Sequence, residues 1–246
     1  MTTRNKIDRS SMWIYGKHAV KAALRNPKRS ILRLIVLESS RDFFDKCATI
    51  KPEIVDRHLF GAIFGKDAIH QGCAVQVKKL QDYSIEELTS DESDDRPFVF
   101  LDQVSDPQNI GSILRASAVF GARAVVVTEN NSPELTPAIS KAASGAMESI
   151  PLIRVINLVH TINNLKKKGF WCIGLDERSD EKIYEMSLNG KFILVVGSEG
   201  EGLRRLTRES CDFLIQLPCM GEFSTLNAAQ AATVSLYEML RQKRSR

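Results

Sequence analysis

The sequence predicts an α/β protein with two domains, of which the larger, C-terminal one is a mainly parallel sheet with helices on both faces. Three observations predict this fold. Beyond the acidic run at residues 90–96, short apolar segments alternate with longer segments of helical periodicity. The apolar segments are nearly continuous, as is typical of strands buried on both faces. The chain has 246 residues, 43% of them apolar, which is enough to bury two cores.

The N-terminal region has the pattern of a small, mixed α/β domain. We expect a flexible N-terminus, a first domain, a linker and a second domain at residues 1–12, 13–80, 81–96 and 97–246, respectively. In the first domain, periodicity predicts helices at residues 16–24, 41–49 and 56–64 and strands at residues 31–37 and 73–77. Ser84 and Glu87 form a capping-box pattern, which predicts a short helix in the linker.

The second domain repeats strand and helix along its length. Apolar runs predict strands at residues 98–101, 124–128, 152–155, 170–175, 192–196 and 213–217. Helices are expected at residues 109–120, after Thr136, between Asn157 and Gly169, and at residues 226–241. Asn109 is placed to cap the first of these helices and Gly121 to end it. Ligands of parallel sheets bind beyond the carboxyl ends of the strands, so we expect the site in the loops that follow them.

Charge is distributed unevenly along the chain. Residues 1–80 carry 16 Lys and Arg against 7 Asp and Glu, a net charge of +9, whereas residues 81–246 carry 18 against 23, a net charge of −5. A basic N-terminal third attracts a polyanion such as RNA, but an ordinary solvated lysine surface explains the surplus equally well. The polar turn His70-Gln-Gly72 has the same two interpretations, an RNA contact or a plain structural turn.

Composition also excludes several classes of protein. No apolar run approaches the roughly 20 residues that span a bilayer, and the first residues lack a secretory signal. The cysteines form no C-x-x-C pair and have no histidine at a metal-ligand interval; they are Cys47, Cys73, Cys172, Cys211 and Cys219. We therefore expect a cytoplasmic protein with reduced, mostly buried thiols, no metal and no membrane association.

The first candidate loop runs from Leu101 to Arg115. Pro107 ends the extended segment, and Gly111 permits the close approach of another backbone or a ligand. The planar guanidinium of Arg115 suits a phosphate or a carboxylate. The alternative is an ion pair between Arg115 and an acid on the helix surface.

Two further loops follow later strands. Between Val196 and Leu203, three glycines surround Glu199, and backbone N–H groups of such a loop hold anionic or polar ligands. The spacing G-x-x-G-x-G is not the dinucleotide fingerprint, and no Gly-Lys-Ser/Thr follows, which disfavours nicotinamide and nucleoside triphosphate enzymes. The loop that ends in Thr225 and Asn227 leads into a helix of small residues, and either residue is a candidate cap. That helix suits a tight packing contact or a dimer interface.

In this order, the three loops resemble the motifs of the SpoU/TrmH family of RNA 2′-O-ribose methyltransferases. The motifs are Asn109-x-Gly111-x-x-x-Arg115, Gly197-Ser-Glu-Gly-Glu-Gly-Leu203, and Leu217-Pro-Cys-Met-Gly221 with Thr225-Leu-Asn227. The resemblance covers residues 97–242. Residues 14–20 and the turn at residues 70–72 further resemble the bacterial subgroup that methylates a guanosine of 23S ribosomal RNA. In that subgroup they belong to a small, ribosomal-protein-like RNA-binding domain.

The resemblance implies a cofactor, a topology and an assembly. The cofactor is S-adenosylmethionine, and the cofactor-binding positions are Gly197, Leu217, Leu226 and Asn227. The C-terminal segment passes through a loop to form a deep trefoil knot, a rare exception to the rule against threading. The catalytic domain forms a homodimer through its first and last helices.

The resemblance also implies a catalytic set, Asn109, Arg115 and Glu199. A ribose 2′-oxygen attacks the activated methyl in line, so the protein must position the groups and stabilise the developing alkoxide. The family's arginine is proposed as a general base, but a guanidinium is effectively always protonated. We therefore expect Arg115 to anchor the RNA phosphate near the partner's cofactor, and Glu199 to orient Arg115 or Asn109.

Two positions depart from the family pattern. Thr225 replaces a serine and keeps the hydroxyl, whereas Ala229 replaces a serine and loses it. Two alternative functions stay open: a transfer-RNA 2′-O-methyltransferase of the same family, and a catalytically silent RNA-binding member. The N-terminal motifs argue against the first. Intact Asn109, Arg115 and Glu199 argue against the second, for which Ala229 is the supporting observation.

Overall fold

The computed structural model describes most of the chain, and its contacts divide the chain into two compact units. The described residues are 10–45, 50–130, 133, 136–221 and 225–245. Unit 1 consists of Met1–Gln81 together with Leu135–Glu148, and unit 2 consists of Asp82–Glu134 and Ser149–Arg246. The first boundary lies close to the expected one after residue 80. The presence of Leu135–Glu148 in unit 1 differs from the expected division, which gave every residue beyond 96 to the second domain.

Unit 1 is built on a mixed sheet with strand order β1-β4-β2-β3. Its elements are β1 (Ser11–Tyr15), α1 (Lys17–Arg25), β2 (Ile31–Val36), η1 (Glu38–Ser40), α2 (Arg41–Asp45), β3 (Glu53–Ile54), α3 (Arg57–Phe64), β4 (Cys73–Lys78), α6 (Pro137–Ala142) and η2 (Ala146–Glu148). β4 pairs antiparallel with β1 and β2, and β2 pairs parallel with β3. α1 buries Val20 in the apolar cluster on one face of the sheet, and α3 buries Phe60 in a second cluster.

Two expectations about unit 1 are affected by the structure. The N-terminus expected to be flexible, residues 1–12, overlaps β1, because Ser11 and Met12 pair with Lys78 and Val77 of β4. The helix expected at residues 41–49 is described only as α2, since residues 46–49 lie outside the described part of the chain.

The segment Leu135–Glu148 completes unit 1 from a distant part of the sequence. α6 packs against β1 and α1. A Cβ atom on Gly145 would come within 2.5 Å of the Cβ of Ala22 in α1, so only glycine permits this approach. Glu148 accepts hydrogen bonds from Nε and Nη2 of Arg29 at 3.0 and 2.7 Å and from Nδ2 of Asn26 at 2.7 Å. These contacts span more than a hundred residues, so they leave no local pattern in the sequence.

Unit 2 is built on a sheet with strand order β10-β8-β9-β5-β6-β7, in which every neighbouring pair is parallel. Its elements are α4 (Ile85–Leu88), β5 (Phe98–Asp102), α5 (Pro107–Phe120), β6 (Ala124–Thr128), β7 (Leu152–Val155), α7 (Leu158–Lys166), β8 (Trp171–Leu175), β9 (Phe192–Gly197), α8 (Arg205–Ser210), β10 (Phe213–Ile215) and α9 (Ala228–Arg244). The expected parallel sheet is confirmed.

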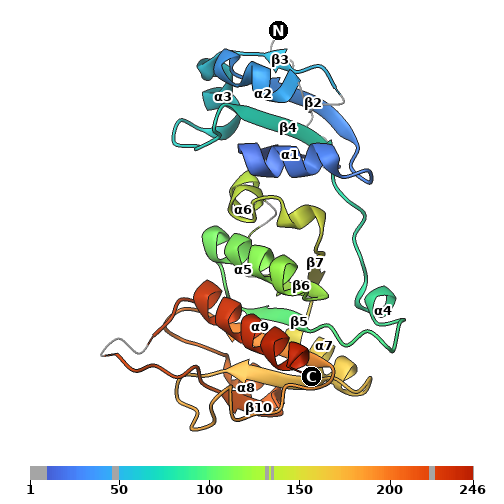
Figure 1. The fold of residues 1–246 in the computed structure, drawn as a ribbon, viewed down its shortest axis with the longest axis vertical. Helices are drawn as coiled ribbons and strands as arrows, with labels where there is room; N and C mark the ends of the chain where they lie inside the picture. The colour runs from blue at the N-terminus through green and yellow to red at the C-terminus, as the bar shows by residue number, and fades with distance from the viewer. Residues whose placement is uncertain (1–9, 46–49, 131–132, 134–135, 222–224, 246) are drawn as a thin grey trace. The chain divides into compact units, whose positions relative to one another are not determined.

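Helices cover both faces of this sheet (Figure 1). Side chains alternate along β5, so Phe98 and Phe100 point to one face and Val99 and Leu101 to the other. The two phenylalanines pack with Ile162 of α7 in one buried cluster. α5 and α9 lie side by side, with α5 in contact with β6 and α9 in contact with β9.

The acidic run expected to be a linker is folded against unit 2. α4 has the expected capping box, in which Ser84 and Glu87 bond each other's backbone N–H groups. Asp94 forms an ion pair at 3.1 Å with Arg123, whose side chain is 1% exposed. Arg123 also donates a hydrogen bond to the carbonyl of Leu88 at 2.9 Å. A buried guanidinium needs such partners, which explains why the acidic run is ordered here.

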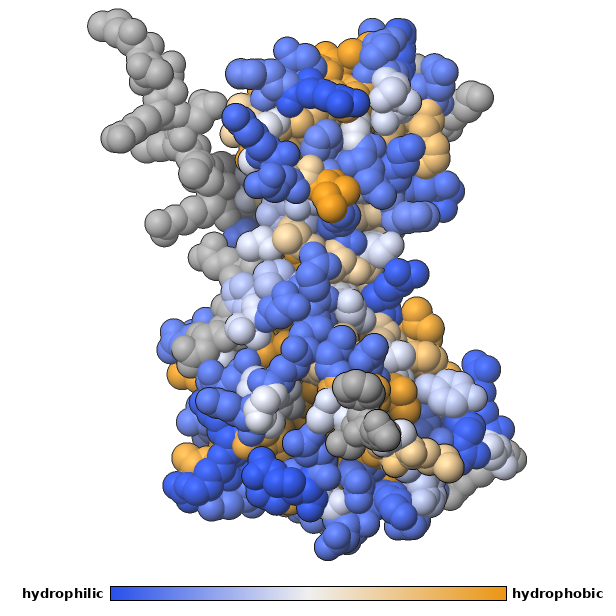
Figure 2. Space-filling view, turned by 90° about the vertical axis from the view of Figure 1, so that its left-hand side faces the viewer, coloured by the Kyte–Doolittle hydropathy of each residue, from blue (hydrophilic) through white to orange (hydrophobic). Residues whose placement is uncertain are grey.

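The cysteines and the surface agree in part with expectation. Cys73 and Cys172 are buried and Cys219 is exposed, while Cys47 lies outside the described residues. Burial raises the pKa of the Cys73 thiol to about 12, so this thiol stays protonated. The face drawn in Figure 2 is mostly hydrophilic, with small, separate hydrophobic patches. In the described part of the chain, no helix has the length and apolar character needed to cross a membrane.

Candidate active site at the carboxyl edge of the parallel sheet

Two adjacent central strands end together at the candidate site. β5 and β9 pair so that Asp102 lies opposite Gly197. Asp102 is fully buried and accepts hydrogen bonds from the backbone N–H and the Nε of Arg204, at 2.9 and 2.7 Å. This carboxylate therefore fastens the end of the glycine-rich loop to β5. Sequence analysis missed the role of Asp102, although a carboxylate that ends an apolar strand was the available signal.

The glycine-rich loop folds back on the end of β9. Ser198 and Gly202 exchange backbone hydrogen bonds at 3.2 and 3.0 Å. Gly202 adopts a φ of +70°, which L side chains rarely adopt. A Cβ atom on Gly197 would lie 2.3 Å from the carbonyl carbon of Gly202, so the loop closes only because Gly197 has no side chain.

The structure brings together two of the three residues expected to be catalytic. Nδ2 of Asn109 donates a hydrogen bond to Oε1 of Glu199 at 2.8 Å, which joins α5 to the glycine-rich loop. The expectation that Asn109 caps α5 is wrong. The cap is Asp106, whose carboxylate accepts from the N–H of Gln108 at 3.0 Å. The helix starts earlier than expected because Pro107 suits its first turn, and this frees the Asn109 side chain to reach Glu199.

Arg115 lies apart from this pair. It is exposed on α5 and makes no hydrogen bond or ion pair with another residue that the structure describes. Arg115 follows Asn109 by six residues, which corresponds to about 9 Å along the helix and about 120° around it. The alternative of a surface ion pair for Arg115 finds no support in the described part of the chain, and Glu199 contacts Asn109 and not Arg115.

The third loop joins β10 to α9. Asn227 caps α9, and its side chain accepts from the N–H of Gln230 at 2.8 Å, which resolves the choice between Thr225 and Asn227 as the cap. Ala229 is buried on α9, 7% exposed, so the position without a hydroxyl lies in the packed part of this helix. Glu222, Phe223 and Ser224 lie outside the described residues.

The residues of this edge fit a nucleoside ligand. Leu217 is half-buried and Leu226 is 42% exposed, so both present apolar surface. Within the described residues, the backbone N–H groups of Leu217 and Leu226 donate to no acceptor. Gly197 ends β9 and Leu217 follows β10, two parallel strands of one sheet, so both lie at the same edge of it. Apolar walls with free backbone donors are what a purine ring requires.

Comparison with known proteins gives the class. Residues 96–237 match the model of the SpoU rRNA Methylase family, and residues 13–83 match the model described as RNA 2′-O ribose methyltransferase substrate binding. The chain belongs to the SpoU rRNA methylase family.

Similar individual proteins are enzymes of known name. The 23S rRNA (guanosine-2′-O-)-methyltransferase RlmB of Pseudomonas aeruginosa is 36% identical over 244 residues, covering 95% of this chain and 98% of that protein. RlmB of Escherichia coli is also 36% identical and covers 95% of this chain and 99% of its own length. The fold matches that of the SpoU methyltransferase AviRb from Streptomyces viridochromogenes in complex with AdoMet, with a TM-score of 0.82, 23% identity, and 99% and 95% of the two chains covered.

Proposed function

We propose that this protein transfers a methyl group from S-adenosylmethionine to the 2′-oxygen of a guanosine in 23S ribosomal RNA. The observation that carries the proposal is the match to RlmB proteins, which extends over both units and 95% of the chain. The cytoplasm, where ribosomal RNA is found, is the proposed place of action. The match of residues 13–83 to a substrate-binding model supports RNA as the partner of unit 1.

The cofactor site is proposed at the carboxyl edge of the sheet. Gly197, Leu217, Leu226 and Asn227 would hold S-adenosylmethionine, through backbone groups and the apolar surfaces of the two leucines. When bound, this cofactor supplies a methyl group activated by a positive sulfur. The chain itself must then exclude water and fix the direction of attack. The hydrogen bond between Asn109 and Glu199 helps to fix the direction of attack, because it ties α5 to the glycine-rich loop at the site.

Arg115 is proposed to act on the site of a second copy of the chain. In the described structure its side chain forms no hydrogen bond or ion pair with Asn109 or Glu199 of its own chain, and it is displaced from Asn109 by about 9 Å along α5 and about 120° around it. A guanidinium that has no partner among the described residues of its own chain is available to a phosphate of RNA, which it binds through parallel hydrogen bonds. In that position it stabilises negative charge on the attacking oxygen.

The assignment requires a homodimer, which we propose to form through α5 and α9. Val119 on α5 and Val234 and Tyr237 on α9 are exposed, by 67%, 45% and 54%. Arg115 and Val119 are four residues apart, so they lie on the same face of α5. The rings of Phe120 and Tyr237 meet edge to face with centroids 6.1 Å apart, which joins the two helices at that surface. An exposed apolar surface over two packed helices is typical of an interface between copies.

A trefoil knot is proposed for the C-terminal part of unit 2. The long segment between β8 and β9 contacts both the end of β10 and the end of α9. The N–H of Ile183 donates to the carbonyl of Gln216 at 3.1 Å, and the N–H of Leu188 donates to Oε1 of Gln242 at 3.0 Å. These contacts support a loop through which the later segment passes.

Ribose methylation mapping tests the proposed function. Mass spectrometry of 23S ribosomal and transfer RNA, from cells with and without the protein, should show one 2′-O-methylguanosine lost from 23S RNA alone. Loss confined to transfer RNA would favour the alternative substrate. A calorimetric titration with S-adenosylmethionine should show binding, and its absence would favour a silent RNA-binding member.

A further inference from the structure

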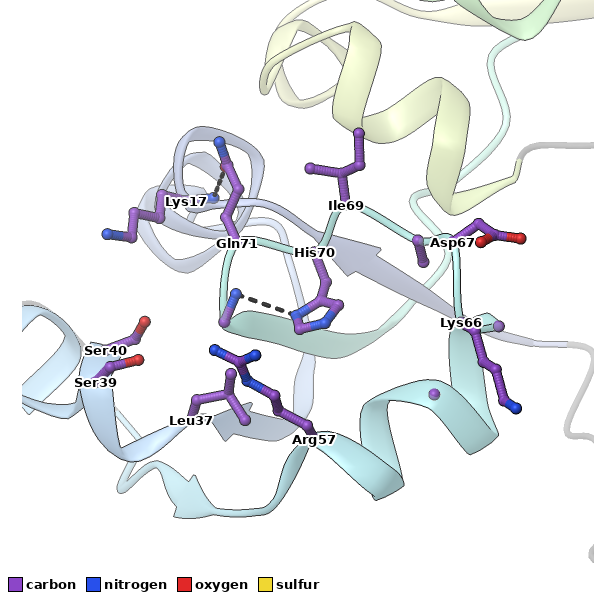
Figure 3. A pocket seen from close by; sticks show the side chains of 14 residues that line it. Lys17, Leu37, Ser39, Ser40, Arg57, Lys66, Asp67, Ile69, His70 and Gln71 are labelled. Carbon is purple, nitrogen blue, oxygen red and sulfur yellow. Dashed lines mark hydrogen bonds between the residues drawn. The ribbon is translucent and has the colours of Figure 1, made fainter.

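Unit 1 contains a cavity outside the candidate active site. Its volume is about 810 Å³, within the range of roughly 300–1,000 Å³ that is usual for ligand pockets. Four parts of unit 1 line it: the start of α1, η1, α3, and the loop at residues 65–72 between α3 and β4. Figure 3 shows Arg57 pointing into it from α3, with Ser39 and Ser40 on one side and His70 on the other.

The charge of this cavity is mostly positive. Lys17, Arg57 and Lys66 line it, with one acid, Asp67. Among the residues that the structure describes, none of the three cations forms an ion pair. Lys17 lies near an aromatic ring instead, with its Nζ 5.7 Å from the centroid of Phe43. Exposed cations around a concave surface attract a phosphate.

The loop at residues 65–72 is held in a fixed shape at this cavity. The side chain of Gln71 accepts a hydrogen bond from the N–H of Lys17 at 2.9 Å, which ties the loop to α1. The His70 ring stacks on the buried Phe60, with centroids 4.1 Å apart and planes at 17°. Nδ1 of His70 accepts from the N–H of Gly72 at 3.1 Å, so in the neutral ring Nε2 carries the hydrogen. Burial and the charge of Arg57 lower the pKa of His70, which keeps the ring neutral.

We propose that this cavity binds one unpaired nucleotide of the RNA substrate, with its phosphate on Arg57 and Lys17 and its base toward the loop at residues 65–72. A concave pocket of this size admits a nucleotide that has left its stack, whereas the phosphates of a duplex lie on a convex surface. Leu37 adds apolar surface for a base, and Nε2 of His70 and the Ser39 hydroxyl add hydrogen-bonding groups. The ligand being RNA rests on the proposed function.

Gly61 makes the proposal testable by a change that fills the cavity without removing charge. It lies within α3, lines the cavity, and a Cβ atom at this position meets nothing within 4 Å. Gly61→Gln therefore projects into open space. The change also replaces a glycine within a helix by a better helix former, so unit 1 keeps its fold. Gly61→Ala is the matched control, because one methyl group leaves most of the cavity free.

The experiment measures binding of the full chain to a short, fluorescently labelled single-stranded RNA of mixed sequence, and to the same strand annealed to its complement. Arg57→Gln should weaken binding of the single strand about tenfold, as for loss of one charged hydrogen bond. Gly61→Gln should weaken it by a similar factor, because the longer side chain occupies the space of the nucleotide. Arg57→Gln should also reduce the salt dependence, by about 0.7 in the slope of log K against log salt. Lys28→Gln, which removes an exposed charge of unit 1 away from the cavity, and Gly61→Ala should bind like the unchanged protein.

Two results would overturn the site. One is full affinity of Gly61→Gln for the single strand; the other is an equal loss for Lys28→Gln and Arg57→Gln, which would indicate a diffuse charge effect. Methylation assays of the same proteins separate this proposal from the proposed function. An unchanged chain that transfers no methyl group, yet binds RNA in a way that depends on Arg57 and Gly61, supports the site and contradicts the function. A chain that methylates ribosomal RNA while every variant binds normally overturns the site alone.

Discussion

Arg29 and Glu148 form a buried ion pair between residues 119 positions apart, with Nη2 and Oε1 at 2.7 Å and side chains only 2% and 8% exposed. Arg29 follows α1, and Glu148 ends η2, so the pair fastens Leu135–Glu148 to the rest of unit 1. Leu135–Glu148 lies between β6 and β7 in the sequence, so the chain leaves the sheet of unit 2 after β6, contributes a segment to unit 1, and returns to the sheet at β7.

Removing one member of this pair should destabilise unit 1 strongly. Arg29→Met leaves the carboxylate of Glu148 buried without its main partner, and the expected loss is about 3–5 kcal/mol. The double change Arg29→Met with Glu148→Leu removes both charges and should recover most of that loss. Urea unfolding measures the free energy of unfolding of the single and the double variant. The chain has two tryptophans, Trp13 in unit 1 and Trp171 in unit 2, so a Trp171→Phe background reports on unit 1 alone. A single change as mild as the double one would contradict a buried, desolvated pair.

The pH dependence of unit 2 should contain a contribution from Asp94. Burial alone would raise the pKa of this carboxyl, but hydrogen bonds from Arg96 and the charge of Arg123 outweigh it and lower the pKa to about 2. The unfolded value is about 3.9, so the stabilisation is complete above that pH and is lost as the pH falls toward 2. Unfolding followed by Trp171 should therefore show a decline over this window.

The matched control for Asp94 is a neighbouring acid. Asp94→Asn should flatten the decline between about pH 4 and 2, and lower stability at neutral pH because Arg123 keeps no carboxylate. Glu92→Gln makes the same kind of change at an exposed position and should leave the profile as it was. An identical profile for Asp94→Asn and the unchanged protein would refute the assignment.

The glycine-rich loop gives a prediction about cofactor binding. Gly197→Ala places a methyl group within 2.6 Å of the backbone of Gly202 and Leu203, so the loop must move away from β9. We expect S-adenosylmethionine binding to fall at least about tenfold, measured by calorimetry. Gly200→Ala is the control: its Cβ meets nothing within 4 Å, and its cost is the left-handed backbone at φ +88°, about 1 kcal/mol. Equal losses for the two changes would show that the close contact at Gly197 is unimportant.

The hydrogen bond between Asn109 and Glu199 predicts a graded response. Glu199→Gln keeps an oxygen that accepts from Nδ2 of Asn109, so methyl transfer should fall only a fewfold, whereas Glu199→Ala removes the acceptor. For Glu199→Ala we expect kcat/KM to fall about tenfold or more, the loss of roughly 1.5 kcal/mol. Asn109→Ala should match it, and the double change should add little, because both remove one interaction. Additive losses would assign the two residues separate roles.

Sequence pattern predicts the parallel sheet of unit 2 well because buried strands and capped helices are local features. The run at residues 98–102, the left-handed Gly121 and the cap Asn157 are each recognisable within a few residues. The prediction that Asn109 caps α5 is wrong because two polar residues, Asp106 and Asn109, flank the same turn. Local pattern does not show which of the two is the cap. The structure shows it, because the Asn109 side chain bonds to Glu199, 90 residues away.

The parts that the sequence does not predict depend on distant contacts. Asp102 and Arg204 meet across 102 residues, and Arg29 and Glu148 across 119. Neither pair has a periodic signature, since each is formed by the way separate elements pack. β1 was missed for a related reason: its buried residues, Ile14 and Tyr15, are adjacent, so the segment lacks the alternation of a strand with one buried face.

The proposed dimer predicts complementation between two inactive chains. If Arg115 serves the site of its partner, a mixed dimer of Arg115→Ala and Gly197→Ala chains contains one site with an intact loop and an intact arginine. Each variant alone should be nearly inactive, whereas an equal mixture that has exchanged subunits should recover roughly a quarter of normal methyl transfer. Half of its dimers are then mixed, and each of these has one working site of two.

The activity of the mixture distinguishes an Arg115 that acts on the partner's site from an Arg115 that acts on the site of its own chain. If Arg115 acted within its own chain, neither chain of a mixed dimer would have a complete site, because one lacks the arginine and the other lacks the intact loop. The mixture of the two variants would then stay inactive. Mixing Arg115→Ala with Arg115→Lys provides the control, because neither chain supplies the planar guanidinium and activity should stay low. A charge on the exposed face of α9 tests the interface itself: Val234→Glu should shift the chain to the monomer in sedimentation and, when both variants of the mixture carry it, abolish the recovery of activity.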